Sequence, residues 1–355
     1  MNWYTRKGSQ AFNSEIDSTL SRMSDEVATA VGEVFTALIL GGGYGREEGA
    51  CVIRDEKESL YNDLDLFLIT TKPYSLTKEV GAVQKKYEHI LGIDVDIGAP
   101  LTISDLQQLP NQLMWHDLLN GHLVLKGPQD IISSHMPSHM KEKVPQVESI
   151  RLALNRGSGL LQAIIASESE KPLSDPDFIR RNYFKAALAF GDCLCITHQV
   201  YTVNLPERLN RLESIKDKIP RQFSDSVPGL YKDAIRFKQS PDSYGRDQTG
   251  INELRVAARL WCDLFIYGEK VRTSKSFSDP ASYVQNGFIR EPEQHRGRNL
   301  LRNIVKNLQM KRISFRYPRE GLYGELVSLL DDPRPEDTQW LRRSEEFLNL
   351  WNTYN

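Results

Sequence analysis

Cysteine is scarce in this chain. Four of its 355 residues are cysteines, and their spacing matches no common zinc-binding pattern. A disulfide framework and a structural zinc site are therefore not expected, and so few cysteines in so long a chain favour a reducing cytoplasm. The four residues are Cys51, Cys193, Cys195 and Cys262.

Long apolar runs and a strong net charge are also missing. No run of 18 apolar residues is present, so the sequence predicts no membrane-spanning helix. The polar segment 1–10 lacks the apolar centre of a signal peptide. A net charge of −2 does not by itself indicate a nucleic-acid partner. We therefore expect a cytoplasmic protein with no membrane partner.

Three familiar motifs are absent as well. Gly-x-Gly-x-x-Gly is interrupted, because Glu48 stands where its third glycine would be. The chain has no Gly-Lys-Ser/Thr and no His-Glu-x-x-His. These absences exclude a Rossmann dinucleotide site, a Walker phosphate loop and a zinc-protease helix.

Residues 38–70 instead combine a glycine-rich turn with a pair of aspartates. An apolar run ends in Gly41-Gly42-Gly43, and a second apolar run carries Asp63-Leu64-Asp65. A third acidic strand follows about thirty residues later at 93–97. Each piece is common alone, but the order of glycine turn, Asp-x-Asp and later acidic strand is typical of enzymes that act on nucleoside triphosphates.

The Asp-x-Asp spacing predicts a metal site. Residues i and i+2 of a strand point the same way, so Asp63 and Asp65 share one face while Leu64 and Leu66 face the core. Such carboxylates suit Mg²⁺, which prefers oxygen ligands. Two ions, Mg²⁺ or alternatively Mn²⁺, would stabilise the attacking and leaving oxygens of an in-line displacement.

A third carboxylate would complete this site and take the proton of the attacking hydroxyl. Asp94 and Asp96 alternate onto the same strand face, so periodicity does not choose between them. We favour Asp96, which lies where the strand ends before Gly98. The glycine turn would let backbone N–H groups approach the phosphates of the triphosphate closely.

These residues resemble the DNA polymerase β nucleotidyltransferase superfamily over roughly residues 34–127. Gly42-Gly43-Tyr44-Gly45-Arg46 is most similar to the GGYGRGE loop of the uridylyltransferase type that modifies the PII signalling protein. The resemblance implies that Gly42, Gly43, Tyr44 and Arg46 hold the triphosphate; Arg46 alternatively pairs with Glu47 or Glu48. The gap of twenty positions from Gly43 to Asp63 is longer than in that family, and its charged part, 54–58, predicts a hairpin tip.

The predicted fold is α+β. A small mixed sheet with helices forms a nucleotidyltransferase domain at 1–140, and an all-α domain follows at 146–355, with loops near 218–249. On a long helix of that second domain, Lys185 shares a face with Arg181. Lys185 is a candidate to reach the triphosphate, and a solvated face is the alternative.

A basic stretch at 290–320 holds nine Lys or Arg residues against three Glu residues, a surplus of 9 − 3 = 6 positive charges. It could contact an RNA or an acidic protein acceptor. A solvated helix face remains the alternative.

The sequence therefore predicts a nucleotidyltransferase. It would move an NMP, AMP or UMP, from an NTP to a hydroxyl on a protein, RNA or small molecule, and release pyrophosphate. Two other classes stay open: a catalytically silent NTP-binding module of a regulatory or toxin–antitoxin pair, and a metal-dependent glycosyltransferase that uses the Asp-x-Asp.

Overall fold

The computed structural model describes residues 3–141, 143–168, 175–244, 249–286, 301, 304–308 and 318–354. The chain divides into two compact units. Unit 1 comprises Met1–Pro145, Tyr201–Arg208 and Ile235–Gly245, and unit 2 comprises Gln146–Val200, Leu209–Ala234 and Arg246–Asn355. Two short segments from the second half of the chain therefore belong to unit 1.

Unit 1 is built on a mixed five-stranded sheet, which confirms the predicted α+β class. The main strand order is β5-β4-β1-β7, with β6 also paired to β4. β1 is antiparallel to both β4 and β7, whereas β4 is parallel to β5 and β6. The strands are β1 (Phe35–Leu40), β4 (Leu64–Thr70), β5 (Val95–Ile97), β6 (Leu101–Thr102) and β7 (Leu123–Lys126).

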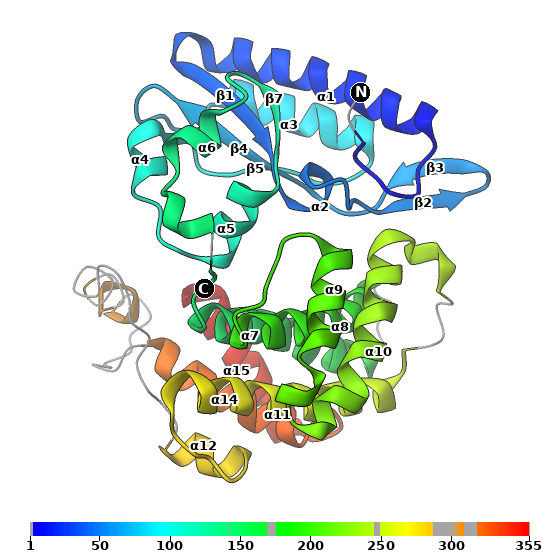
Figure 1. Ribbon diagram of the computed structural model, residues 1–355, viewed down its shortest axis with the longest axis vertical. Helices are drawn as coiled ribbons and strands as arrows, with labels where there is room; N and C mark the ends of the chain where they lie inside the picture. The colour runs from blue at the N-terminus through cyan, green and yellow to red at the C-terminus, as the bar shows by residue number, and fades with distance from the viewer. Residues whose placement is uncertain are drawn as a thin grey trace. The chain divides into compact units, whose positions relative to one another are not determined.

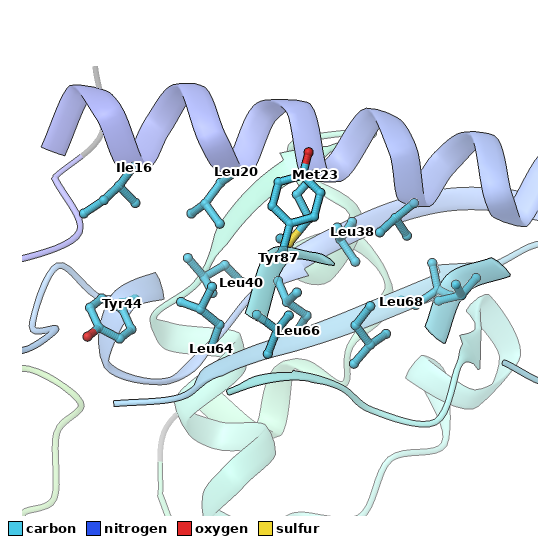
Figure 2. Packing of buried hydrophobic residues seen from close by; sticks show 14 of the residues in the cluster. Ile16, Leu20, Met23, Leu38, Leu40, Tyr44, Leu64, Leu66, Leu68 and Tyr87 are labelled. Atoms are coloured by element: carbon cyan, nitrogen blue, oxygen red, sulfur yellow. The ribbon is translucent and has the colours of Figure 1, made fainter. Parts of the chain in front are cut away.

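Helices cover both faces of this sheet because alternate strand residues are apolar on both sides. On one face, the leucines of β1 and β4 pack under α1 (Gln10–Val31) and α3 (Lys78–Leu91), as Figure 2 shows. Figure 1 shows the two helices beside the sheet. On the other face, Ala37, Ile39 and Ile69 pack with α4 (Ile103–Gln107), α5 (Leu113–Asn120) and α6 (Ile131–His135). The sheet is thus held between two apolar layers.

The charged stretch before the Asp-x-Asp forms a hairpin. β2 (Cys51–Arg54) pairs antiparallel with β3 (Lys57–Leu60). Asp55 and Glu56 between them have φ values of 50° and 63°. Two left-handed residues in a two-residue loop match the twist of the flanking strands. The predicted hairpin tip is confirmed.

The described residues of the second half form helices joined by short connections and contain no strand, as predicted. Within unit 2, α7 packs against α8 and α11, and the Trp261 indole of α11 donates a 2.7 Å hydrogen bond to the Ala153 carbonyl of α7. The described part of the second half includes the helices α7 (Val147–Ser167), α8 (Phe178–Thr197), α9 (Leu205–Ser214), α10 (Arg221–Gln239), α11 (Ile251–Thr273), α12 (Pro280–Asn286), α14 (Pro318–Asp331) and α15 (Thr338–Tyr354).

Of the loops predicted near 218–249, the part at 221–239 is wrong, because α10 occupies these residues and contains Pro228. A proline inside a helix costs about 3 kcal/mol. The cost is offset by a buried stripe at helical spacing, in which each large side chain contributes about 1.5–3 kcal/mol. The stripe consists of Phe223, Val227, Tyr231, Ala234 and Phe237.

The basic stretch at 290–320 lies mostly outside the described residues, so its contact with an RNA or a protein stays a prediction. Among the helices that are described, none combines the length and apolar character needed to cross a membrane.

Candidate active site

The glycine turn and the aspartates meet at one edge of the sheet in unit 1. β1 ends there, and β4, β5 and β7 begin there, because Leu40 is the register partner of both Leu66 and Leu123, while Leu64 is the partner of Val95. The hydrogen bond from the Gly41 amide to the Asp65 carbonyl, 2.8 Å long, joins the turn to the Asp-x-Asp. The topology therefore gathers the residues that the sequence singled out.

The aspartates lie side by side on neighbouring strands. Asp65 and Asp96 are register partners in the parallel β4–β5 pair, which places their side chains on one face. The Leu64 amide donates to the Asp94 carbonyl at 2.9 Å, so Asp94 lies beside the start of β4. Asp63, Asp94 and Asp96 are exposed, and Asp65 is partly buried. The predicted shared face of the carboxylates is consistent with this register.

The donor chemistry fits Mg²⁺, but the protein alone does not form a closed cage. Across the described residues, no group of three or more His, Cys, Asp or Glu side chains is arranged to hold a metal ion. Mg²⁺ is usually held by one or two carboxylates together with waters and substrate phosphates. Asp65 and Asp96, in register on neighbouring strands, are carboxylates that fit such an incomplete shell. Metal binding by these two residues and Asp63 stays a prediction.

Gly42 makes the contact between the turn and the Asp-x-Asp. The turn becomes a short helix, α2 (Gly42–Gly45), directly after β1. Gly42 has a φ of 61°, and a Cβ added there would lie 2.0 Å from Asp65 Oδ2. The left-handed backbone and the carboxylate both require glycine. The backbone of the turn therefore lies directly against Asp65.

Gly43 differs from its neighbour. Its φ is not in the left-handed region, and the atoms nearest to an added Cβ would be 3.8 Å away, an ordinary contact. The fold itself does not require glycine at this position. The first N–H groups of a helix have no partner inside it, so the start of α2 offers donors next to the aspartates.

Tyr44 is buried in the core rather than presented to a ligand (Figure 2). Its hydroxyl donates to the Ala50 carbonyl at 3.0 Å and accepts from the amides of Tyr61 and Asn62 at 3.0 and 3.3 Å. Burial raises the pKa of Tyr44 to about 12, so it remains a neutral hydroxyl. Tyr44 ties the glycine turn to the residues immediately before Asp63.

Arg46 forms ion pairs within unit 1. Its Nε lies 3.6 Å from Glu48 Oε2, and one terminal nitrogen lies 3.8 Å from Asp117 Oδ2. Of the two carboxylates suggested by the sequence, Glu48 is the buried one and Glu47 is exposed. The pairing alternative for Arg46 is therefore present in the structure.

Asp117 lies near the turn and was not singled out by the sequence. Tyr201 donates a 3.0 Å hydrogen bond to Asp117. Burial acts to raise the pKa of Asp117, but His116, Arg46, Arg208 and Tyr201 outweigh it, and the pKa lies below its usual value. No local sequence signal could reveal a contact between residues 84 positions apart.

His122, which the sequence also did not single out, precedes β7 at the same sheet edge. Its Nδ1 lies 2.8 Å from the Leu118 carbonyl. Burial lowers the pKa of His122, an effect that the Leu118 hydrogen bond only partly opposes. The ring is therefore neutral at pH 7, with Nδ1 donating to the carbonyl.

Lys185 is exposed on α8 of unit 2. Its neighbour on the helix face, Arg181, forms an ion pair with Asp175. The aspartates and the glycine turn belong to unit 1, so the contact of Lys185 with a triphosphate stays a prediction.

Comparison with known proteins finds a similar solved structure. It is the crystal structure of spectinomycin adenyltransferase AAD(9) from Enterococcus faecialis with ATP and spectinomycin. The similarity covers 70% of this chain and 98% of that one at 9% identity, with a TM-score of 0.42. No protein-family model and no curated protein sequence matches the chain.

Proposed function

We propose that the protein is a nucleotidyltransferase that moves an NMP, AMP or UMP, from an NTP to a hydroxyl acceptor. The hydroxyl oxygen attacks the α-phosphorus, the bond from that phosphorus to pyrophosphate breaks, and the hydroxyl proton is taken up by a carboxylate. The acceptor belongs to a protein, an RNA or a small molecule. The buried free thiols of all four cysteines suit a cytoplasmic location.

The observation that carries this proposal is the contact between Gly42 and Asp65. The proposal is supported by the close approach of the Gly42 backbone to the Asp65 carboxylate, with Asp96 in register on the next strand. Backbone phosphate donors and a metal-binding carboxylate need to lie this close only if the phosphates and the metal belong to one ligand. A metal-bound triphosphate is such a ligand.

Each group of site residues has its own proposed role. Asp63 and Asp65 would hold two Mg²⁺ ions, or Mn²⁺, which when bound neutralise charge on the attacking and leaving oxygens. Asp96, exposed beside Asp65, would accept the proton of the hydroxyl. The backbone of Gly42 and Gly43 would hold the leaving phosphates, which stay bound as pyrophosphate forms.

The test is to incubate the purified protein with each α-labelled NTP and Mg²⁺, in turn with cell protein, cell RNA and small molecules that carry hydroxyls. We expect transfer of label to one acceptor class together with pyrophosphate. NTP binding without label transfer or pyrophosphate in any arm would favour the silent module. A parallel arm replaces the NTP with a labelled sugar nucleotide, and turnover there but not with any NTP would favour the glycosyltransferase.

A further inference from the structure

Glu48 is a charged residue buried at the end of the glycine turn. Glu47 takes a left-handed φ of 60°, and the chain then continues with two backbone bonds, from the Glu48 amide to Gly43 at 2.8 Å and from the Gly49 amide to Tyr4 at 3.1 Å. The Glu48 side chain is 2% exposed. Its backbone therefore closes the turn, while its carboxylate lies in the interior of unit 1.

The partners of this carboxylate come from the second half of the chain. Oε1 accepts the Leu205 amide at 2.9 Å, from a residue 157 positions away. Oε2 accepts the Lys238 ammonium at 3.4 Å, from a residue 190 positions away. The Cε of Lys238 also lies 3.8 Å from where a Gly43 Cβ would be. Leu205 thus contacts the turn through Glu48, and Lys238 contacts it through both Glu48 and Gly43.

The buried charges depend on one another. A buried carboxylate is tolerated only when cations and hydrogen-bond donors compensate its lost hydration. Within the described part of the chain, Arg46 Nε is buried and has no hydrogen-bond partner, so its compensation is the Coulombic attraction of Glu48 and Asp117. Loss of the Glu48 charge would remove the anion that Arg46 and Lys238 share beside the turn.

The segment at 201–208 is held in shape by contacts of its own side chains. Arg208 is 3% exposed and donates to the carbonyls of Thr202 and Val203 at 2.6 and 2.9 Å. Its guanidinium lies 4.3 Å from the Tyr201 ring centre, and Tyr201 in turn bonds Asp117. Glu48 therefore binds a segment with a defined shape, not an isolated amide.

We propose that Glu48 is a positioning residue that couples the glycine turn to residues 201–208 and to Lys238. The turn keeps its phosphate-binding shape only while the Glu48 carboxylate holds these two segments. This inference rests on the proposed function for its effect on nucleotide, but the coupling itself exists without nucleotide. Two measurements therefore separate the two ideas.

The test variant is Glu48→Gln, which keeps the side-chain shape and an acceptor for Leu205 but removes the charge. Glu269→Gln is the matched control, because Glu269 is also fully buried and bound to an arginine, Arg272, but lies in unit 2. Amide hydrogen exchange of both variants is followed without nucleotide at 42–49 and 201–208. The affinity of both variants for a fluorescent NTP with Mg²⁺ is then measured, together with their steady-state kinetics.

We expect amide exchange in Glu48→Gln to rise both at 42–49 and at 201–208, and the affinity for NTP to fall about tenfold. KM for NTP should rise while kcat changes little, because Asp63, Asp65 and Asp96 are untouched. A purely structural defect would instead lower kcat in proportion to the unfolded fraction, with KM unchanged. Glu269→Gln should leave exchange at both segments, and KM, as in the wild type.

Other results overturn the inference. If the wild type binds NTP and Glu48→Gln binds it equally well, the proposed function stands and the positioning role is wrong. Exchange that rises at only one segment also contradicts the coupling. If the wild type binds no NTP but exchange rises at both segments in Glu48→Gln, the coupling stands and the proposed function is wrong.

Discussion

Glu48 in unit 1 and Glu269 in unit 2 are both almost completely buried, and they are held in different ways. Glu269 in unit 2 pairs with Arg272 at 2.7 Å, three residues along the same helix, and accepts the Tyr283 hydroxyl. Glu48 in unit 1 is held by residues 157 and 190 positions away. The first arrangement stabilises one helix and its neighbour, whereas the second joins distant segments around the candidate active site.

This difference shows where the chain uses buried charge to build a site. A local pair at i, i+3 follows from helical periodicity and needs no other part of the chain. A long-range pair fixes the relative position of segments that share no secondary structure. We therefore expect substitution of the buried charge at the sheet edge of unit 1 to alter nucleotide binding, and substitution of the buried Glu269 pair in unit 2 to alter stability alone.

The sheet-edge aspartates should show the largest effect. Asp96→Asn keeps the shape of the side chain but cannot take a proton, and turnover should fall about a hundredfold or more. Asp94→Asn should have a smaller effect. Single-turnover rates at saturating Mg-NTP decide between them. A larger loss in Asp94→Asn would exchange the two assignments, and small losses in both would contradict a catalytic role for this strand.

Removal of the Tyr44 hydroxyl should have the second-largest effect. In Tyr44→Phe the amides of Tyr61 and Asn62 lose their buried acceptor, and the free energy of unfolding should fall by about 1–3 kcal/mol. Urea unfolding followed by circular dichroism measures this change. Tyr183 on α8 of unit 2 is only partly buried, so Tyr183→Phe is the matched variant and should lose less. An unchanged urea midpoint in Tyr44→Phe would show that the hydroxyl does not hold this segment.

The two glycines sharpen the comparison within the turn itself. Gly43→Ala should fold normally but bind Mg-NTP about tenfold more weakly, because the added methyl occupies space where phosphate would approach. Gly42→Ala should cost about 1–3 kcal/mol of stability through its left-handed φ and the Asp65 contact. Titration with a fluorescent NTP and urea unfolding separate the two effects. Wild-type affinity in Gly43→Ala would mean that the turn is only structural.

The smallest expected effect is on the pH dependence of stability. It compares Asp117 of unit 1 with Asp331 of unit 2. Since its partners hold the pKa of Asp117 below its usual value, Asp117 contributes stability at neutral pH that is lost as pH falls below about 4. Burial and the neighbouring Asp332 and Asp279 raise the pKa of Asp331, so ionised Asp331 opposes folding as pH rises above about 4.

Asp117→Asn should therefore destabilise the protein at pH 7, with a difference from wild type that shrinks in acid. Asp331→Asn should stabilise it at pH 7 by less than about 1 kcal/mol. Urea unfolding at pH 7 and near pH 3.5 measures both changes. The same sign of effect at pH 7 for the two variants would contradict this contrast.

Much of unit 1 could be predicted from local patterns. Apolar alternation around Asp63 and Asp65 predicted β4, and the charged stretch before it predicted the β2–β3 hairpin. These features depend on strand periodicity and turn chemistry within a few residues. The helical second half was likewise predicted from a local pattern, apolar residues at helical spacing.

The remaining features depend on contacts between distant residues. Pro228 suggested a loop, but the buried stripe of α10 outweighed it. Tyr44 looked like a ligand contact because it lies in a glycine-rich turn, yet its hydroxyl bonds are to backbone groups up to 18 positions away. The burial of Glu48 by Leu205 and Lys238 has no local signal, since these partners are 157 and 190 positions away.

The most direct test of the proposed chemistry is pyrophosphate release by the wild type and by Asp65→Asn, each with saturating Mg-NTP and the identified acceptor. Asp65 contacts the turn and is in register with Asp96, so the proposed chemistry depends most on its carboxylate. We predict Mg²⁺-dependent release by the wild type and a loss of at least about a thousandfold in the variant, with its circular dichroism spectrum unchanged. Release by folded Asp65→Asn at a rate near that of the wild type would contradict the proposal.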